Sequence, residues 1–214
     1  MSSAEKQMDA KLSPSLRPVK DVPGLPRVLL LGDSISMGYT LRVRALLAGK
    51  ANVHRAPTNC GPTTKGLAEI DAWIGTGHWD VIHFNFGLHD LKFLKPGVQA
   101  VPPARYETNL RQLVAKLEKT GAHLVWASTT PVTDKHKPGQ FPRVPADVVI
   151  YNAIAAKVVG EHGIAIDDLY AAVADRLVEL QNPTDVHFKS RGYDVLAGHV
   201  AAAITAALPA PAKP

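Results

Sequence analysis

The sequence predicts an α/β fold in three layers, with helices on both faces of a five-stranded parallel sheet. Short apolar runs of strand length alternate along the chain with segments whose apolar residues recur at helical spacing, which is the pattern of repeated βαβ units. The 214 residues, of which 46% are hydrophobic and 20% charged, suffice for one domain with a single large core.

Five apolar runs are expected to form the strands, at 28–31, 53–56, 81–86, 123–127 and 164–166. Strands of a parallel sheet are buried on both faces and therefore read as continuous apolar runs, as these do. Helical stripes lie over 104–119, before the fifth strand and near the C-terminus, and a further helix is expected near 168–180. The stripe residues of those three helices are Tyr106, Leu110, Leu113, Val114 and Leu117; Ile150, Ile154, Ala155 and Val158; and Tyr193, Leu196, Val200 and Ile204.

The elements together predict a doubly wound, flavodoxin-like α/β/α sandwich, in which ligands bind at the carboxyl ends of the strands. The polar, proline-punctuated residues 1–26 are expected to form an N-terminal arm, residues 27–207 the folded domain, and 208–214 a disordered tail. The long segment 129–145 follows a strand end, so it is expected either to border the site or to be a solvated excursion.

Charge and cysteine content restrict the partners. The net charge is 24 − 19 = +5, but the densest basic set (Arg42, Arg44, Lys50 and Arg55) lacks interleaved aromatic residues, so the charge is interpreted as a solvated surface without a nucleic-acid partner. The single cysteine, Cys60, excludes an intrachain disulfide. The apolar runs are far shorter than the ~20 residues that a membrane-spanning helix needs.

Residues 1–26 contain no apolar core of a signal peptide, so the chain as written is expected to be cytoplasmic. Removal of an export signal would leave the same sequence, and a periplasmic or secreted location therefore stays open.

Ser34 ends the stretch "VLLLGDS", where the first strand meets its loop. One interpretation is that Asp33 or Ser34 merely caps the following helix, because both residue types are preferred there. The other is that Ser34 is a nucleophile at the carboxyl edge of the sheet. The tripeptide alone does not decide between them.

Three further pieces follow other strands. In "PTDVHFKS", His187 could accept the proton of a serine and Asp185 could orient its imidazole, or both could be ordinary turn residues. Gly61 follows the second strand and could present a bare N–H to an oxyanion, and His89 follows the third and could add a side-chain donor. Each has a plain structural alternative, as a turn glycine or a capping histidine. All of them nevertheless fall at one edge of the sheet.

These motifs resemble those of the SGNH hydrolases, also called GDSL lipases and esterases, over residues 27 to about 206. The blocks are "GDSISMG", "GPTTKGL", "GLHD" and "DVHFKSRGY". The resemblance implies an SGNH hydrolase-type catalytic domain with Ser34 as nucleophile, His187 as base, and the Ser34 N–H, Gly61 N–H and His89 as oxyanion donors. It implies no metal and no cofactor, and neither HExxH nor Cys-x-x-Cys spacing is present.

Two departures accompany the resemblance. His89 stands where the family has asparagine, which we interpret as the mark of a branch with Gly-Leu-His-Asp. The family's acid lies three residues before the histidine, where this chain has Thr184, while Asp185 lies two before. The site is therefore either a triad with Asp185 or a Ser–His dyad. Asp33 and Asp90 are expected to brace loops rather than to move protons.

The function expected from these motifs is a serine ester hydrolase for short acyl esters, acetyl esters above all, with carbohydrate esters among its substrates. Its partner would be a small-molecule or carbohydrate ester. The alternatives are a non-catalytic carbohydrate- or partner-binding domain and an acyltransferase that uses the same residues. A nucleotide-binding flavodoxin-like protein is disfavoured, because "GDSISMG" lacks the glycine spacing of a phosphate loop.

Overall fold

Five parallel strands form the central sheet of the computed structural model, which describes residues 12–210. The strand order is β2-β1-β3-β6-β7, and every neighbouring pair is parallel. The predicted three-layer α/β/α fold is thereby confirmed. The strands are β1 (Arg27–Leu31), β2 (Asn52–Arg55), β3 (Val81–Phe84), β6 (His123–Ala127) and β7 (Ala165–Asp167).

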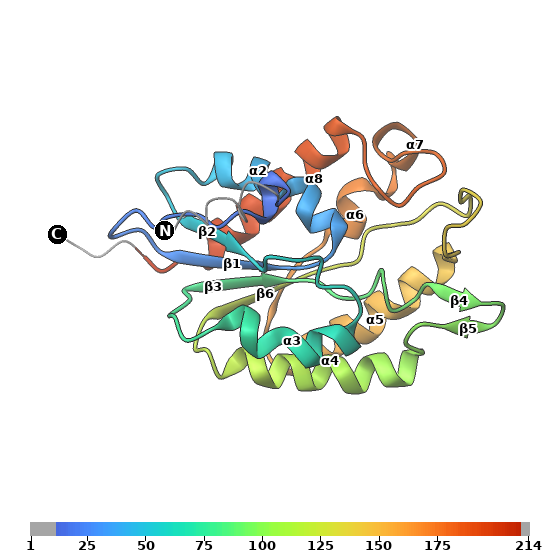
Figure 1. Cartoon of the computed structure of the whole chain (residues 1–214), viewed down its shortest axis with the longest axis horizontal. Helices are drawn as coiled ribbons and strands as arrows, with labels where there is room; N and C mark the ends of the chain where they lie inside the picture. Colours follow the sequence, from blue (N-terminus) through green and yellow to red (C-terminus); the bar gives the residue numbers. More distant parts are fainter. Residues whose placement is uncertain (1–11, 211–214) are drawn as a thin grey trace.

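Helices cover both faces of the sheet (Figure 1). One layer holds α2 (Ser34–Leu46), α6 (Leu169–Ala174) and α8 (Ser190–Ala207), in which α8 packs on both of the others. The opposite layer holds α3 (Thr63–Ile74), α4 (Pro103–Glu118) and α5 (Pro145–Glu161), packed in that order. The short elements η1 (Pro14–Leu16) and α7 (Leu177–Leu180) complete the helices of the described residues.

The strand order reverses between β1 and β3. The chain leaves β1 into α2 on one face of the sheet and leaves β3 toward α4 on the other, so the loops after these two neighbouring strands diverge (Figure 1). Divergent loops leave a crevice at the carboxyl edge of a parallel sheet. The fold therefore places the residues after Leu31 and after Phe84 at the position where ligands bind in such sheets.

Two expected elements differ from the structure. The single helix expected near 168–180 is wrong, because the chain forms α6 and then α7, with an interruption at Asp175 and Arg176. The third strand was expected over 81–86 but ends at Phe84, since the Asn85 side chain donates to the Ala127 carbonyl and the Phe86 carbonyl accepts from Tyr106.

The buried face of α5 is rotated from the expected stripe. Ile150 is 48% exposed, whereas Tyr151 is fully buried and its hydroxyl donates to the Val101 carbonyl. Tyrosine has an apolar ring with one polar end, so it can face a core wherever its hydroxyl finds an acceptor. A stripe counted from aliphatic residues alone missed this. The stripe of α4, in contrast, is buried as expected.

A two-stranded hairpin, β4 (Phe93–Lys95) with β5 (Val98–Gln99), lies between β3 and α4 and was not expected from the sequence. Its turn uses Gly97 at a φ of 73°, a left-handed conformation that glycine adopts without steric cost. The Phe93 N–H donates to the Pro142 carbonyl, which attaches the hairpin to the segment between β6 and α5.

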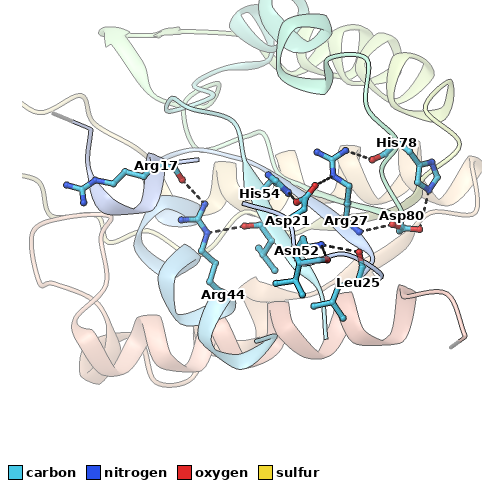
Figure 2. Close-up of polar contacts among 11 residues, drawn as sticks. Arg17, Asp21, Leu25, Arg27, Arg44, Asn52, His54, His78 and Asp80 are labelled. Carbon is cyan, nitrogen blue, oxygen red and sulfur yellow. Dashed lines mark hydrogen bonds and ion pairs between the residues drawn. The ribbon is translucent and has the colours of Figure 1, made fainter. Parts of the chain in front are cut away.

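The described part of the N-terminal arm is attached to the sheet through Asn52 and Asp21 (Figure 2). The Asn52 amide donates to the carbonyls of Val22 and Leu25 and accepts from the Val22 N–H. Asp21 pairs with Arg27 at 3.0 Å and with His54 at 2.5 Å. Residues 1–11 of the expected arm and 211–214 of the expected tail lie outside the described residues. The division of the chain at 26 and 207 stays a prediction.

Helices α2 and α8 approach closely because α2 has a glycine at the contact. A Cβ atom at Gly38 would overlap the Tyr193 ring of α8. Beside this contact, Arg42 pairs with Asp194 at 2.5 Å and donates to Ser190 Oγ at 2.8 Å. Gly38 lies about one turn after Ser34, and Tyr193 lies in the first turn of α8, six residues after His187, so this contact lies close to both residues along the chain.

We expect Gly38→Ala to lower the free energy of unfolding by about 1–3 kcal/mol, because the new methyl group must displace the Tyr193 ring or separate the helices. Urea denaturation measures the change. Gly198→Ala is the matched control, since no atom lies within 4 Å of a Cβ at that position of α8. It should be neutral or stabilising by up to about 1 kcal/mol. Equal effects at the two positions would contradict the close contact.

Candidate active site

Ser34 is the first residue of α2, and Asp33 is the residue that caps this helix. The Asp33 carboxylate accepts from the Ile35 N–H at 2.9 Å, and the Asp33 carbonyl accepts from Ser36 Oγ at 2.9 Å. The side-chain cap of α2 is therefore Asp33, and the hydroxyl of Ser34 takes no part in it. Ser34 Oγ has a different partner.

That partner is His187. Its Nε2 lies 2.8 Å from Ser34 Oγ, and its Nδ1 lies 2.7 Å from Asp185 Oδ1. The same carboxylate oxygen accepts from the His187 backbone N–H at 3.3 Å, so the turn between the two residues closes on itself. A spacing of two residues is therefore enough for Asp185 to reach the ring. Of the two sequence alternatives, this geometry corresponds to the triad.

The environment of Asp185 favours its ionised form. Burial alone would raise the pKa of this carboxyl, but the hydrogen bond from the His187 ring, together with the backbone N–H donors of His187 and Val186, brings the pKa below its usual value. A carboxylate beside Nδ1 keeps the proton on that nitrogen, which leaves Nε2 as the acceptor for Ser34 Oγ.

The loop that carries Asp185 and His187 is attached at its base. Gln181 and Phe188 form an isolated antiparallel bridge, and the Asn182 N–H donates to the His187 carbonyl at 3.0 Å. The Gln181 side chain is buried and donates to the carbonyls of Pro131 and Val186. These bonds hold the loop that carries His187 in place relative to the segments of Pro131 and Gln181.

Three groups were expected to donate hydrogen bonds to an oxyanion. Two are unoccupied: within residues 12–210, neither the Ser34 N–H nor a ring nitrogen of His89 has a hydrogen-bond partner. The Gly61 N–H, at a φ of 64°, donates to Asn59 Oδ1 at 2.9 Å. Gly61 can therefore serve an oxyanion only by sharing or exchanging this bond.

His89 is half-buried after β3, and its surroundings favour the neutral imidazole. Burial lowers its pKa, Asp33 acts in the opposite direction, and the positive charges of Arg143 and Lys92 lower the pKa further. A neutral imidazole has one N–H donor. His89 therefore enters the site near neutral pH as a donor without a full charge.

Asp90 connects the loop of His89 with the loop of Gly61. Its Oδ1 accepts from both the N–H and the hydroxyl of Thr63, the first residue of α3, at 2.9 and 2.5 Å. Asn109 in turn donates to the Thr63 hydroxyl. The other oxygen of Asp90 is buried and has no partner in the described residues. Burial is the main cause that raises the pKa of Asp90 to about 7.

The loops after β1 and β2 are connected through Gly32 and Cys60. The Cys60 N–H donates to the Gly32 carbonyl, and the Gly32 N–H donates to Cys60 Sγ at 3.3 Å. Cys60 is fully buried, and burial raises its pKa to about 11. The thiol therefore acts as a structural contact of the loop that carries Ser34.

Arg55 was expected from the sequence to lie on a solvated surface. This assignment is wrong: Arg55 is only 7% exposed and lies below the loop of Ser34. Its guanidinium donates to the carbonyls and hydroxyls of Ala56, Ser36, Thr40, Gly32 and Thr58. The only sequence signal was its place at the end of an apolar strand, and a strand end can be either buried or solvated.

Residues 30–195 match the GDSL-like Lipase/Acylhydrolase family, which is more than half of the chain. The chain belongs to this family. Among curated proteins, none matches the sequence significantly. The resemblance to SGNH hydrolases is thereby confirmed, and the protein is an ester hydrolase of small-molecule substrates.

Solved structures of the same fold accompany the family match. The lipase/acylhydrolase from Enterococcus faecalis gives a TM-score of 0.73 at 19% identity, covering 89% of this chain and 100% of its own. The acetyl xylan esterase AlAXEase gives 0.70 at 16% identity, covering 83% and 99%. A variant of Axe2, an acetyl-xylooligosaccharide esterase from Geobacillus Stearmophilus, gives 0.72 at 17% identity, covering 86% and 96%. At these identities the likeness establishes the fold alone.

Residues 12–210 hold neither a membrane-spanning helix nor a cluster of metal ligands. None of the helices there has the length and apolar character that crossing a membrane requires. The same residues contain no group of three or more His, Cys, Asp or Glu side chains placed to hold a metal ion.

We expect the pKa of Asp90 to make stability depend on pH. Its raised folded pKa means that its contribution is fully present below the unfolded value of 3.8 and is lost as pH rises through about 7. Relative to Asp90→Asn, the wild type should therefore lose a few kcal/mol of unfolding free energy across this window. Urea denaturation of both proteins at several pH values measures the difference. A difference that does not change with pH would show that the carboxyl titrates normally.

Proposed function

We propose that this ester hydrolase cleaves short-chain acyl esters, acetyl esters above all, through an acyl-enzyme on Ser34, with carbohydrate esters among its substrates. The observation that carries the proposal is the continuous hydrogen-bonded series of Ser34 Oγ, His187 and Asp185, at 2.8 and 2.7 Å. A serine hydroxyl becomes a nucleophile when an adjacent base takes its proton, and a third group that orients the base completes the arrangement.

In the first half of the reaction, Ser34 Oγ attacks the ester carbonyl while His187 Nε2 accepts its proton. Asp185 stabilises the imidazolium that forms, because its carboxylate lies 2.7 Å from Nδ1. His187 then gives the proton to the departing alcohol, and an acyl group remains on Ser34. In the second half, His187 takes a proton from water, whose oxygen attacks the acyl carbon. The bond from the acyl carbon to Ser34 Oγ then breaks, His187 returns the proton to Oγ, and the acid is released.

The developing oxyanion is stabilised by the Ser34 N–H and the His89 N–H, which have no other partner in the described residues. Ser34 stands at the N-terminus of α2, where the helix dipole also favours negative charge. Gly61 contributes a third donor when an oxyanion replaces Asn59 Oδ1 as its acceptor. Donors already in place before the reaction are usually the largest single contribution of such a site.

The preference for acetyl and carbohydrate esters is supported by the structural neighbours rather than by a contact in the site. Two of the proteins that share the fold are described as acting on acetylated xylan or xylooligosaccharides. The aligned triad favours hydrolysis over the non-catalytic alternative, because a binding module has no need of a base within 2.8 Å of a serine. An acyltransferase would use the same residues with an alcohol in place of water.

The first test compares hydrolysis of para-nitrophenyl acetate, butanoate and octanoate by the wild type, Ser34→Ala and Asp185→Asn. We expect turnover to decrease with chain length and Ser34→Ala to lose about three orders of magnitude or more. Asp185→Asn should lose about 10²–10⁴-fold in kcat, because asparagine stabilises the wrong tautomer. Asp175→Asn, on an exposed residue of the α6–α7 interruption, is the matched control. Full activity of Ser34→Ala would refute the proposed nucleophile.

A second test concerns His89. His89→Ala should lower kcat about 10²–10³-fold, the usual effect of losing one oxyanion donor, while His89→Asn should retain more activity because it keeps a donor. Since burial lowers the pKa of His89, its protonation should appear only at the acid end of the pH profile. This part of the profile of kcat/KM should therefore change in His89→Asn. An unaltered profile together with an active His89→Ala would exclude His89 from the site.

A further inference from the structure

Arg143 reaches the edge of the candidate site from the segment between β6 and α5. It is half-buried, and its Nε donates to the carbonyl of Leu88, the residue before His89, at 2.8 Å. Its Nη1 donates to the Phe141 carbonyl at 3.2 Å. The same segment is attached to the hairpin through Pro142, and both lie at one end of the molecule (Figure 1).

The guanidinium of Arg143 has no anionic partner. Within residues 12–210 no carboxylate lies within ion-pair distance of it, and its Nη2 makes no hydrogen bond although it is not fully buried. Arg55 differs in this respect, since its contacts engage all three guanidinium nitrogens below the loop of Ser34. Arg143 therefore retains a charged donor for a group that comes from outside the chain.

Lys92 is a second cation without a carboxylate partner in the described residues. Its Nζ lies 4.7 Å from the centroid of the Phe141 ring, so Lys92 and Arg143 both contact Phe141. Phe141 is 47% exposed and lines a groove of about 500 Å³ between the hairpin and residues 139–142. An apolar surface therefore adjoins the two charges.

The charges of Arg143 and Lys92 act on the site itself. Burial has the largest effect on the pKa of His89, followed by Asp33. The charges of Arg143 and Lys92 come next, and both lower this pKa. The acids that act on Arg143 are Asp33 and Asp185, and both already have other partners: Asp33 caps α2, and Asp185 holds His187. Neither is therefore available to neutralise Arg143 by a direct ion pair.

We propose that Arg143 and Lys92 form an anion subsite beside the nucleophile, so that the preferred substrates are esters that carry a carboxylate near the scissile bond. The guanidinium would bind the carboxylate through Nη2, and the ammonium would add a second, more mobile charge. This inference rests on the proposed function, because it names the substrate class of the same site. The carboxylate can lie on the acyl group or on the alcohol, and the two are distinguished by experiment.

Two matched ester pairs separate these cases. Para-acetoxybenzoate and para-acetoxybenzamide differ in charge on the alcohol side. The mono-para-nitrophenyl ester of glutaric acid and para-nitrophenyl butanoate differ in charge on the acyl side. We expect the wild type to favour the anionic member of at least one pair, and this preference to weaken as salt is added, because salt screens a partly exposed charge. The pair that responds identifies the side of the ester.

The variants are Arg143→Gln, Arg143→Lys, Lys92→Gln and the control Lys119→Gln, an exposed lysine at the end of α4. Arg143→Gln should lower the anionic-to-neutral ratio of kcat/KM about tenfold or more, as expected for one charge-assisted hydrogen bond. Arg143→Lys should keep part of the preference, and Lys92→Gln should lose less. Lys119→Gln should leave the ratio unchanged. Because the readout is the ratio of kcat/KM for the anionic and neutral esters, a general loss of activity caused by movement of the Leu88 carbonyl cancels.

The outcomes distinguish the two proposals. If the wild type hydrolyses the neutral esters but shows no preference that depends on Arg143 or Lys92, the subsite is refuted and the proposed function stands. If none of the esters is hydrolysed, the proposed function fails. Whether the anion subsite exists is then decided by measuring how tightly the protein binds an anionic and a neutral ester. For this purpose Ser34→Ala is titrated calorimetrically with para-acetoxybenzoate and para-acetoxybenzamide, with and without Arg143→Gln. Equal affinities for the two compounds would overturn the subsite.

Discussion

The site depends on the close packing of α2 against α8. Ser34 begins the first helix and His187 directly precedes the second, so a hydrogen bond of 2.8 Å between residues 153 positions apart requires the helix axes to be close. Gly38 makes this possible, because any larger side chain would overlap Tyr193. Gly192 has the same effect on the other side of the loop, where a Cβ would lie 2.5 Å from the Leu180 carbonyl. Backbone approach of this kind is a common reason for glycine inside helices.

Around this contact, the loops after three strands are connected to one another by buried polar groups. Asp90 joins the loop of His89 to the start of α3, Cys60 joins the second loop to Gly32, and Arg55 lies below both. These groups are costly to bury: the Arg55 charge has only neutral acceptors, and Asp90 has one oxygen without a partner in the described residues. Such a network is expected where donors must stand in place before the reaction begins, since rigidity at the site is obtained at the expense of stability.

Arg143 and Lys92, the two cations at the edge of the site, differ from the buried Arg55 in their hydrogen bonding. Arg55 is saturated with hydrogen bonds and can only position its neighbours, whereas Arg143 and Lys92 keep donors that the described residues do not use. Both rim cations belong to segments outside the main sheet, one near the hairpin and one before α5. The proposed catalytic residues thus belong to the sheet, its helices and their loops, while the proposed anion subsite belongs to connecting segments, which vary most easily between related proteins.

The local order of the chain determined much of this protein. Apolar runs and helical stripes predict the parallel strands and α4, since burial on two faces or on one leaves a direct mark on residue spacing, and Ser34, Gly61, His89 and His187 follow from motifs at strand ends. Four features were decided only in the tertiary structure. Asp185 reaches His187 because the turn between them folds back on itself. Tyr151 takes the core position expected for Ile150, because the Val101 carbonyl accepts its hydroxyl. Arg55 is buried because five acceptors surround its guanidinium, and the hairpin is held in place by a hydrogen bond to the Pro142 carbonyl. Each depends on a partner remote in sequence or on the shape of a turn, and residue spacing encodes neither.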